Sequence, residues 1–146
     1  MVRRVLVAFD ESPQAAAALR HAVDTYPDAE LHVLHVNDPR EWVFGDEMGA
    51  FYSESAYEDA QASAEALLDD AAAIAEEAGV PVETAVETGR AGNAIVEYAD
   101  ANDVDHVVMG SHGRTGLSRF LLGSVAETVA RRSPTSVTIV RNRSDA

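Results

Sequence analysis

The chain has 146 residues, of which 25 are acidic and 11 are arginine, and it contains no cysteine and no lysine. This composition excludes disulfides, cysteine-ligated zinc, a Walker-type phosphate loop and Schiff-base chemistry on lysine. The formal charge of −14 also argues against non-specific binding of nucleic acid, which depends on a basic protein surface.

The N-terminal segment predicts a buried strand over residues 3–9, with Asp10 at its carboxyl end. Ser12 and Pro13 form a helix start, a serine N-cap followed by proline at the first helical position. The alanine-rich helix then runs to about Tyr26. Because the chain enters this strand without a signal-peptide pattern, and no run reaches the roughly 18 apolar residues of a membrane span, we expect a soluble cytoplasmic protein.

Residues 31–36 predict the next strand, and the segment from Asp38 to Ser55 shows no hydrophobic period. Aromatic residues punctuate this segment, which fits either a lid over a site or a surface cover pinned by aromatic anchors, and we favour the cover. A long helix follows from about Tyr57 to Ala78, with apolar residues at helical spacing, and Gly79 ends it.

The second half of the chain continues the alternation of strands and helices. Residues 82–87 alternate polar and apolar side chains, as an edge strand with one solvated side does. A short helix then carries Ile95, Val96 and Ala99 on its apolar face. The remaining predicted elements are a central strand at 105–109, a helix at 124–132 and a last strand at 136–140.

Strands that alternate with helices indicate an α/β fold in a single domain, residues 1–146, with a doubly wound, five-stranded parallel sheet and helices on both faces. We expect the strand order 3-2-1-4-5, in which the winding reverses between the first and fourth strands. Ligands of open α/β sheets bind at that point, beyond the carboxyl ends of the strands. Asp10 and Gly110 both fall there.

The stretch from Met109 to Val125 has the composition of a phosphate site. It places three glycines, Gly110, Gly113 and Gly123, between a buried strand and a helix start, and glycine permits positive φ and close approach of a phosphate. No acidic residue lies between Asp105 and Glu127, whereas Arg114 and Arg119 do. The glycines could instead be plain turn residues, and Ser124 with Glu127 fits a capping box.

The spacing of this stretch resembles a known signature. Gly110, two residues, Gly113, nine residues and then Gly123-Ser124 is similar to the nucleotide-binding motif of the universal stress protein family, in its ATP-binding branch. The first strand with Asp10, the second strand and the last strand are also similar to that family. The resemblance covers nearly the whole chain and is weakest over residues 38–56.

The resemblance implies an adenine nucleotide, ATP, and a pocket for it. It places Asp10 near the ribose or a divalent cation, Mg²⁺ or Mn²⁺, for which carboxylate oxygens are suitable ligands; a second cap on the first helix is the alternative. It implies that the backbone of Val36 contacts adenine. The other positions that match the family pocket are Ala8, Phe9, Met109, Ser111 and Val125. Together with Gly110, Gly113, Arg114, Gly123 and Ser124, these form the expected site.

The last strand, from Ser136 to Arg141, predicts a homodimer. Val137, Ile139 and Val140 make it an apolar edge, and such edges invite pairing with a second chain. The family resemblance places the dimer contact at the same strand. No nucleic acid and no membrane partner is expected.

The resemblance implies a nucleotide-dependent sensor or switch in the stress response. Nothing in the loop resembles a positioned general base, so hydrolysis would be slow at most. Two alternatives remain: an ATPase or self-phosphorylating enzyme that uses Asp10 and a metal, and a dimeric interaction module that binds no nucleotide. His32 and His35 point to opposite faces of a strand, so we do not expect them to share a metal. The acidic charge fits either solubility or a salt-rich cytoplasm.

Overall fold

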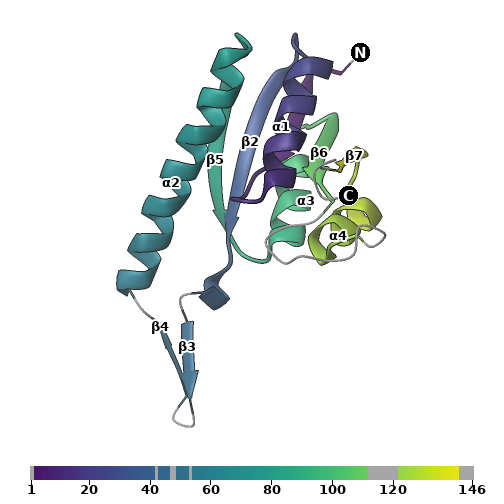
Figure 1. Cartoon of the computed structure of the whole chain (residues 1–146). Coiled ribbons are helices and arrows are strands. Elements are labelled where there is room, and N and C mark those ends of the chain that lie inside the picture. Colours follow the sequence, from purple (N-terminus) through teal and green to yellow (C-terminus); the bar gives the residue numbers. More distant parts are fainter. Residues whose placement is uncertain (1, 42, 47–48, 53, 112–121, 142–146) are drawn as a thin grey trace.

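The computed structural model describes residues 2–41, 43–46, 49–52, 54–111 and 122–141. Five strands and four helices make up the main body of the protein (Figure 1). In chain order these are β1 (Arg4–Ala8), α1 (Pro13–Thr25), β2 (Glu30–Asn37), α2 (Glu54–Glu77), β5 (Val82–Thr88), α3 (Ala91–Ala101), β6 (His106–Gly110), α4 (Ser124–Arg132) and β7 (Ser136–Val140).

All five strands of the main sheet are parallel, and their spatial order is β5-β2-β1-β6-β7. Numbered along the chain, that order is 3-2-1-4-5, which confirms the predicted fold class. β5 and β7 form the two edges of the sheet. The winding reverses between β1 and β6, so the carboxyl ends of these two strands lie side by side at the expected binding position.

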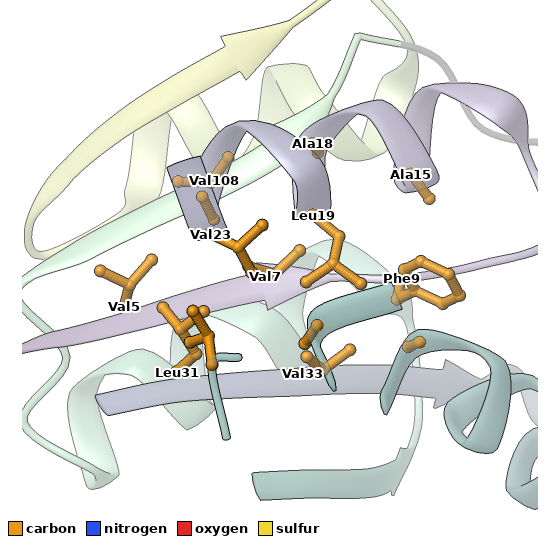
Figure 2. Close-up of a cluster of buried hydrophobic side chains, with 14 of the residues drawn as sticks. Val5, Val7, Phe9, Ala15, Ala18, Leu19, Val23, Leu31, Val33 and Val108 are labelled. Carbon is orange, nitrogen blue, oxygen red and sulfur yellow. The ribbon is translucent and has the colours of Figure 1, made fainter. Parts of the chain in front are cut away.

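The helices cover the sheet on two sides because successive strand residues point to opposite faces. On one face, Val5 and Val7 of β1 pack with Leu19 of α1 and with apolar residues of α2 (Figure 2). On the other face, Leu6 packs with Ile95 of α3 and with residues of α4. Each such fully buried side chain contributes roughly 1.5–3 kcal/mol relative to an exposed one.

Local signals set the ends of the helices as predicted. Ser12 is the N-cap of α1, where its Oγ accepts a hydrogen bond from the backbone N–H of Ala15 at 3.2 Å, and Pro13 is the first helical residue. After α2, Gly79 takes a positive φ of 73° and its N–H donates to the carbonyl of Glu76. That left-handed position favours glycine, which explains why α2 ends there.

The segment after β2 is more regular than the sequence predicts. A 3-10 turn at Pro39–Glu41 leads into an antiparallel hairpin of β3 (Val43–Asp46) and β4 (Gly49–Tyr52). In Figure 1 this hairpin extends beyond the carboxyl end of β2, away from the main sheet. Two short paired strands therefore occur where the sequence shows no hydrophobic period, and the role of this segment as a surface cover stays a prediction.

Within the part of the chain that the structure describes, no helix combines the length and the apolar character needed to cross a bilayer.

Candidate functional site

A cavity of about 370 Å³ opens at the carboxyl ends of β1, β2 and β6. Its size is within the range of small-molecule sites. Residues at the starts of α1, α3 and α4 complete its wall. The predicted site residues that line it are Ala8, Phe9, Asp10, Val36, Met109, Gly110, Ser111, Gly123, Ser124 and Val125. The structure thus brings together residues that lie more than a hundred positions apart in the chain.

Two predicted site residues, Gly113 and Arg114, lie outside the described residues. The role that the sequence assigns to them stays a prediction.

Asp10 is held by a turn between β1 and α1. Its Oδ1 accepts a hydrogen bond from the backbone N–H of Ser12 at 2.8 Å. This bond fixes the carboxylate beside the cavity and orders the N-cap residue, but it reaches no N–H of the first helical turn. Ser12 is the N-cap of α1. Asp10 therefore supports the start of the helix only through its bond to Ser12, which is part of the capping role that the alternative assigns to it.

Gly110 is explained by close packing and not by an unusual backbone angle. Among the described glycines only Gly79 and Gly89 have positive φ. A Cβ at Gly110 would lie 2.6 Å from Cβ of Gln14 and 3.1 Å from its carbonyl oxygen. Glycine here lets α1 approach β6 closely, and the positive φ that glycine permits is not used at this position.

The start of α4 corrects the expected capping box. Gly123 is the N-cap, with φ −66° and ψ 160°, and Ser124 is the first helical residue. Ser124 is exposed at the cavity, and Glu127 instead pairs with Arg131 at 2.8 Å. The serine hydroxyl is therefore not used as a helix cap.

The backbone before α4 is tied to the sheet. The N–H of Gly123 donates to the carbonyl of Ser111 at 2.8 Å, and the N–H of Ser111 donates to the carbonyl of Val140 at 3.0 Å. The first N–H groups of a helix have no partner within it, and those of Ser124 and Val125 have no acceptor among the described residues. They lie in the cavity wall, where the positive end of the helix dipole favours an anion.

Phe9 contributes to the cavity mainly through its backbone. Its side chain is only 6% exposed and belongs to the core between the sheet and helices α1 and α2 (Figure 2). Its carbonyl bonds to Nδ1 of His35 at 2.8 Å, and its N–H donates to the carbonyl of Leu34 at 2.9 Å. A bulky residue at this position therefore does not fill the cavity.

Sequence reasoning missed an ion pair on the cavity wall, Asp38 with Arg40. Nε of Arg40 lies 3.0 and 2.8 Å from the two carboxylate oxygens of Asp38, and the backbone N–H of Arg40 donates to Oδ1 at 2.9 Å. The hydrogen bond from the Arg40 side chain is the main reason why the pKa of Asp38 is below its ordinary value. The one available signal was position, since Asp38 follows β2 as Asp10 follows β1.

Other missed cavity residues come from β2 and α3. His35 at the end of β2, and Ala91 and Ile95 of α3, line the cavity next to the predicted residues. Their contribution depends on where α3 crosses the sheet, which a linear pattern does not specify.

The chain is similar over most of its length to proteins of one family. Residues 1–141 match the family model described as the universal stress protein family. Universal stress protein MJ0531 of Methanocaldococcus jannaschii is 33% identical to this chain, over 97% of this chain and 83% of that protein.

Solved structures of universal stress proteins are also similar to this chain. The structure of MJ0577, a universal stress protein of Methanocaldococcus jannaschii, is 30% identical with a TM-score of 0.78, and the match covers 97% of both chains. A universal stress protein solved in complex with cAMP is 28% identical with a TM-score of 0.72, and the match covers 95% of this chain and 97% of that one.

Proposed function

This chain belongs to the universal stress protein family, and we propose that it binds ATP with a divalent cation in the cavity at the carboxyl ends of β1 and β6. The observation that carries the proposal is the meeting of Asp10, Gly110 and the start of α4 on one cavity wall. The complex of a similar protein with cAMP supports an adenine nucleotide as the ligand.

In this proposal the phosphates lie at the start of α4. The backbone N–H groups of Ser124 and Val125 would donate to phosphate oxygens, and the exposed hydroxyl of Ser124 would add a further donor. Gly123 keeps the approach to these groups free of a side chain. Gly113 and Arg114 would contact the same phosphates, by the resemblance of the loop to the family motif.

The adenine end of the ligand would lie near β2. Val36 is half-buried beside the cavity, and its backbone would contact adenine. Ala8, Met109 and Ile95 supply apolar surface for the base and the sugar.

The charges of the cavity fit a divalent cation. Among the described cavity residues, Asp38 is neutralised by Arg40, whereas the Asp10 carboxylate accepts a hydrogen bond from the Ser12 N–H and has no cationic side chain beside it. We propose that its second oxygen binds Mg²⁺ or Mn²⁺, which when bound to phosphate oxygens offsets their charge. Asp10 would then position the ribose and phosphates relative to each other.

The cellular role that we propose is a sensor or switch in the stress response, whose state depends on bound nucleotide. Slow hydrolysis is the most we expect, because the Asp38 carboxylate, which could otherwise activate a water, is bound by Arg40. The ring of His35 is held by a bond between its Nδ1 and the carbonyl of Phe9.

We also propose that the protein is a homodimer joined through β7. This strand is an edge of the sheet, and Val137, Thr138, Ile139 and Val140 on it are only partly buried within one chain. Pairing of two such edges would cover them.

Native mass spectrometry of the purified protein tests the binding proposal directly. We expect a mass increase that corresponds to one adenine nucleotide per chain after incubation with ATP and Mg²⁺. A protein that stays free of nucleotide at millimolar ATP would favour the interaction-module alternative. Phosphate release measured on the same sample distinguishes the enzyme alternative, which requires many turnovers where we expect a slow reaction at most.

A further inference from the structure

A second group of ligand-type side chains lies at the other end of β2, far along the strand from the nucleotide cavity. It consists of Glu30 and His32 on β2 and Glu83 on β5, and we call it the β2–β5 triad. His32 and Glu83 are directly paired in the sheet register, and Glu30 is two residues from His32 on the same face of the strand. The sheet itself therefore holds the three side chains together.

His32 is the buried member of the triad. It is 5% exposed, and its Nε2 makes no hydrogen bond with any described residue. That nitrogen points at the two carboxylates, with Oε2 of Glu30 and Oε2 of Glu83 each 3.4 Å away. A buried polar atom without a hydrogen bond is costly, so its position beside two oxygen ligands requires an explanation.

The other ring nitrogen of His32 is already fixed. Nδ1 lies 2.7 Å from the hydroxyl of Tyr98 on α3, and the two rings pack edge to face with centroids 5.8 Å apart. When Nδ1 donates its proton to the Tyr98 oxygen, Nε2 carries the lone pair. Metal-binding histidines are usually held by such a hydrogen bond from the second nitrogen.

The distances within the triad fit a metal ion. Zinc takes nitrogen at about 2.0–2.1 Å and carboxylate oxygen at about 2.0–2.2 Å in a tetrahedron, whose neighbouring ligands are then about 3.4 Å apart. The two distances from Nε2 have this value, and all three ligand atoms lie within 4.8 Å of one another. In the tautomer whose Nε2 carries the lone pair, that lone pair faces two negative oxygens, and a cation between them would remove the repulsion.

Two carboxylates and one arginine surround His32. Arg4 pairs with Oε2 of Glu30, so an ion bound there would share that oxygen with the guanidinium. Glu83 is 68% exposed at its side chain and free to adjust its oxygen toward an ion. The −14 charge of the chain attracts divalent cations in general.

We propose that the β2–β5 triad is a binding site for one divalent transition metal ion, with zinc as the best match. His32, Glu30 and Glu83 supply three ligands, and water completes the coordination on the exposed side. The bound ion would join β2 to the edge strand β5. An imidazole ligand disfavours Mg²⁺, so this site is chemically distinct from the one proposed at Asp10.

Calorimetric titration of the full chain with zinc chloride, without nucleotide and with excess Mg²⁺, tests the proposal. We expect saturation at one ion per chain, and affinity at least about tenfold weaker in His32→Gln and in Glu83→Gln. The matched controls are His21→Gln, an exposed histidine on α1, and Glu87→Gln, four residues further along β5 on the same face, and both should bind like the wild type.

Melting temperatures measured with zinc and with a chelator complete the test. Zinc should raise the melting temperature of the wild type and of both controls, and not that of Glu83→Gln, whose exposed position keeps its fold intact. Absence of saturable binding in the wild type would overturn the proposal. So would zinc affinity that is unchanged in both His32→Gln and Glu83→Gln.

Discussion

Gly110 has a role in the packing of the fold and also lies in the proposed nucleotide site. It ends β6 beside the cavity, and the absence of a side chain lets α1 pack against the strand at Gln14. The same residue therefore lies in the cavity wall and permits close packing of α1 on β6. Sequence reasoning assigned Gly110 to the site for its place in the glycine motif and at the switch point, which stays a prediction, and the structure adds a packing reason for glycine there.

Gly110→Ala should lower the free energy of unfolding by about 1–3 kcal/mol. The new methyl group would meet Cβ of Gln14 and the backbone of α1, and overpacking of this kind costs that amount. Urea unfolding of the variant measures it, with Glu76→Gln on the exposed face of α2 as the control. Stability equal to that of the wild type would show that α1 can move away without cost.

Asp105 stabilises the amino end of β1 through its charge. Its Oδ2 accepts the backbone N–H groups of Arg3 and Arg4, each at 2.9 Å, and these bonds, that of Arg4 first, lower its pKa below the usual 3.8. A carboxyl with a lowered pKa in the folded state contributes stability above its unfolded pKa. This contribution is lost as the pH falls through the folded pKa.

Asp105→Asn should therefore melt below the wild type at pH 7, and the difference should shrink as the pH falls below about 4. Thermal unfolding of both proteins across that range is the measurement, and the exposed Asp69→Asn on α2 is the control. A difference that stays constant down to pH 2 would mean that the charge of Asp105 is not what matters.

Among the helices, the sequence predicts the bounds of α1 and α4 closely. The helix expected at 124–132 has those bounds in the structure, and the first helix differs by one residue at its end. Strand order also followed from the sequence, because right-handed crossovers between parallel strands leave few arrangements. This strand order alone places Asp10 and Gly110 at the ends of neighbouring strands.

The β3–β4 hairpin shows where prediction failed. Each of its strands has four residues, which is too short for alternation to be detected. The sequence between them, Glu47-Met48, is not one of the Asn-Gly or Asp-Gly pairs that signal a tight hairpin. Arg40 was missed for a different reason. Its place on the cavity wall depends on the path of the chain after β2, which no sequence pattern specifies.

The edge strand β7 carries the prediction for assembly. Sedimentation equilibrium at micromolar concentration should give a dimer for the wild type, and Ile139→Lys should shift it toward monomer by placing charge in the paired edge. Thr84→Lys, exposed on the opposite edge strand β5, is the matched control and should remain dimeric. A wild type that is monomeric throughout would refute the role of β7.

At the scale of the whole molecule, the net charge of −14 should control stability through self-repulsion. The Debye length falls from about 10 Å at 0.1 M salt to about 3 Å at 1 M, so repulsion between distant carboxylates weakens. We expect the melting temperature to rise with KCl from about 0.1 to 2 M. A flat or falling curve would count against adaptation to a salt-rich cytoplasm.

We propose that ATP binds at the stretch from Gly110 to Ser124. Calorimetric titration of the protein with ATP and Mg²⁺ measures this binding. Gly123→Val adds a side chain at the N-cap of α4, and Gly113→Val does so within the predicted loop. Both should bind ATP much more weakly than the wild type. Arg114→Glu should lose on the order of 1–3 kcal/mol if a charge-assisted hydrogen bond is removed.

Glu76→Gln is the control, because it lies on α2 away from the cavity, and its affinity should match that of the wild type. Circular dichroism of each variant confirms that the fold is retained. We expect saturable binding at one ATP per chain, and we expect both glycine variants to abolish or strongly weaken it. Affinity like that of the wild type in both Gly113→Val and Gly123→Val would contradict it.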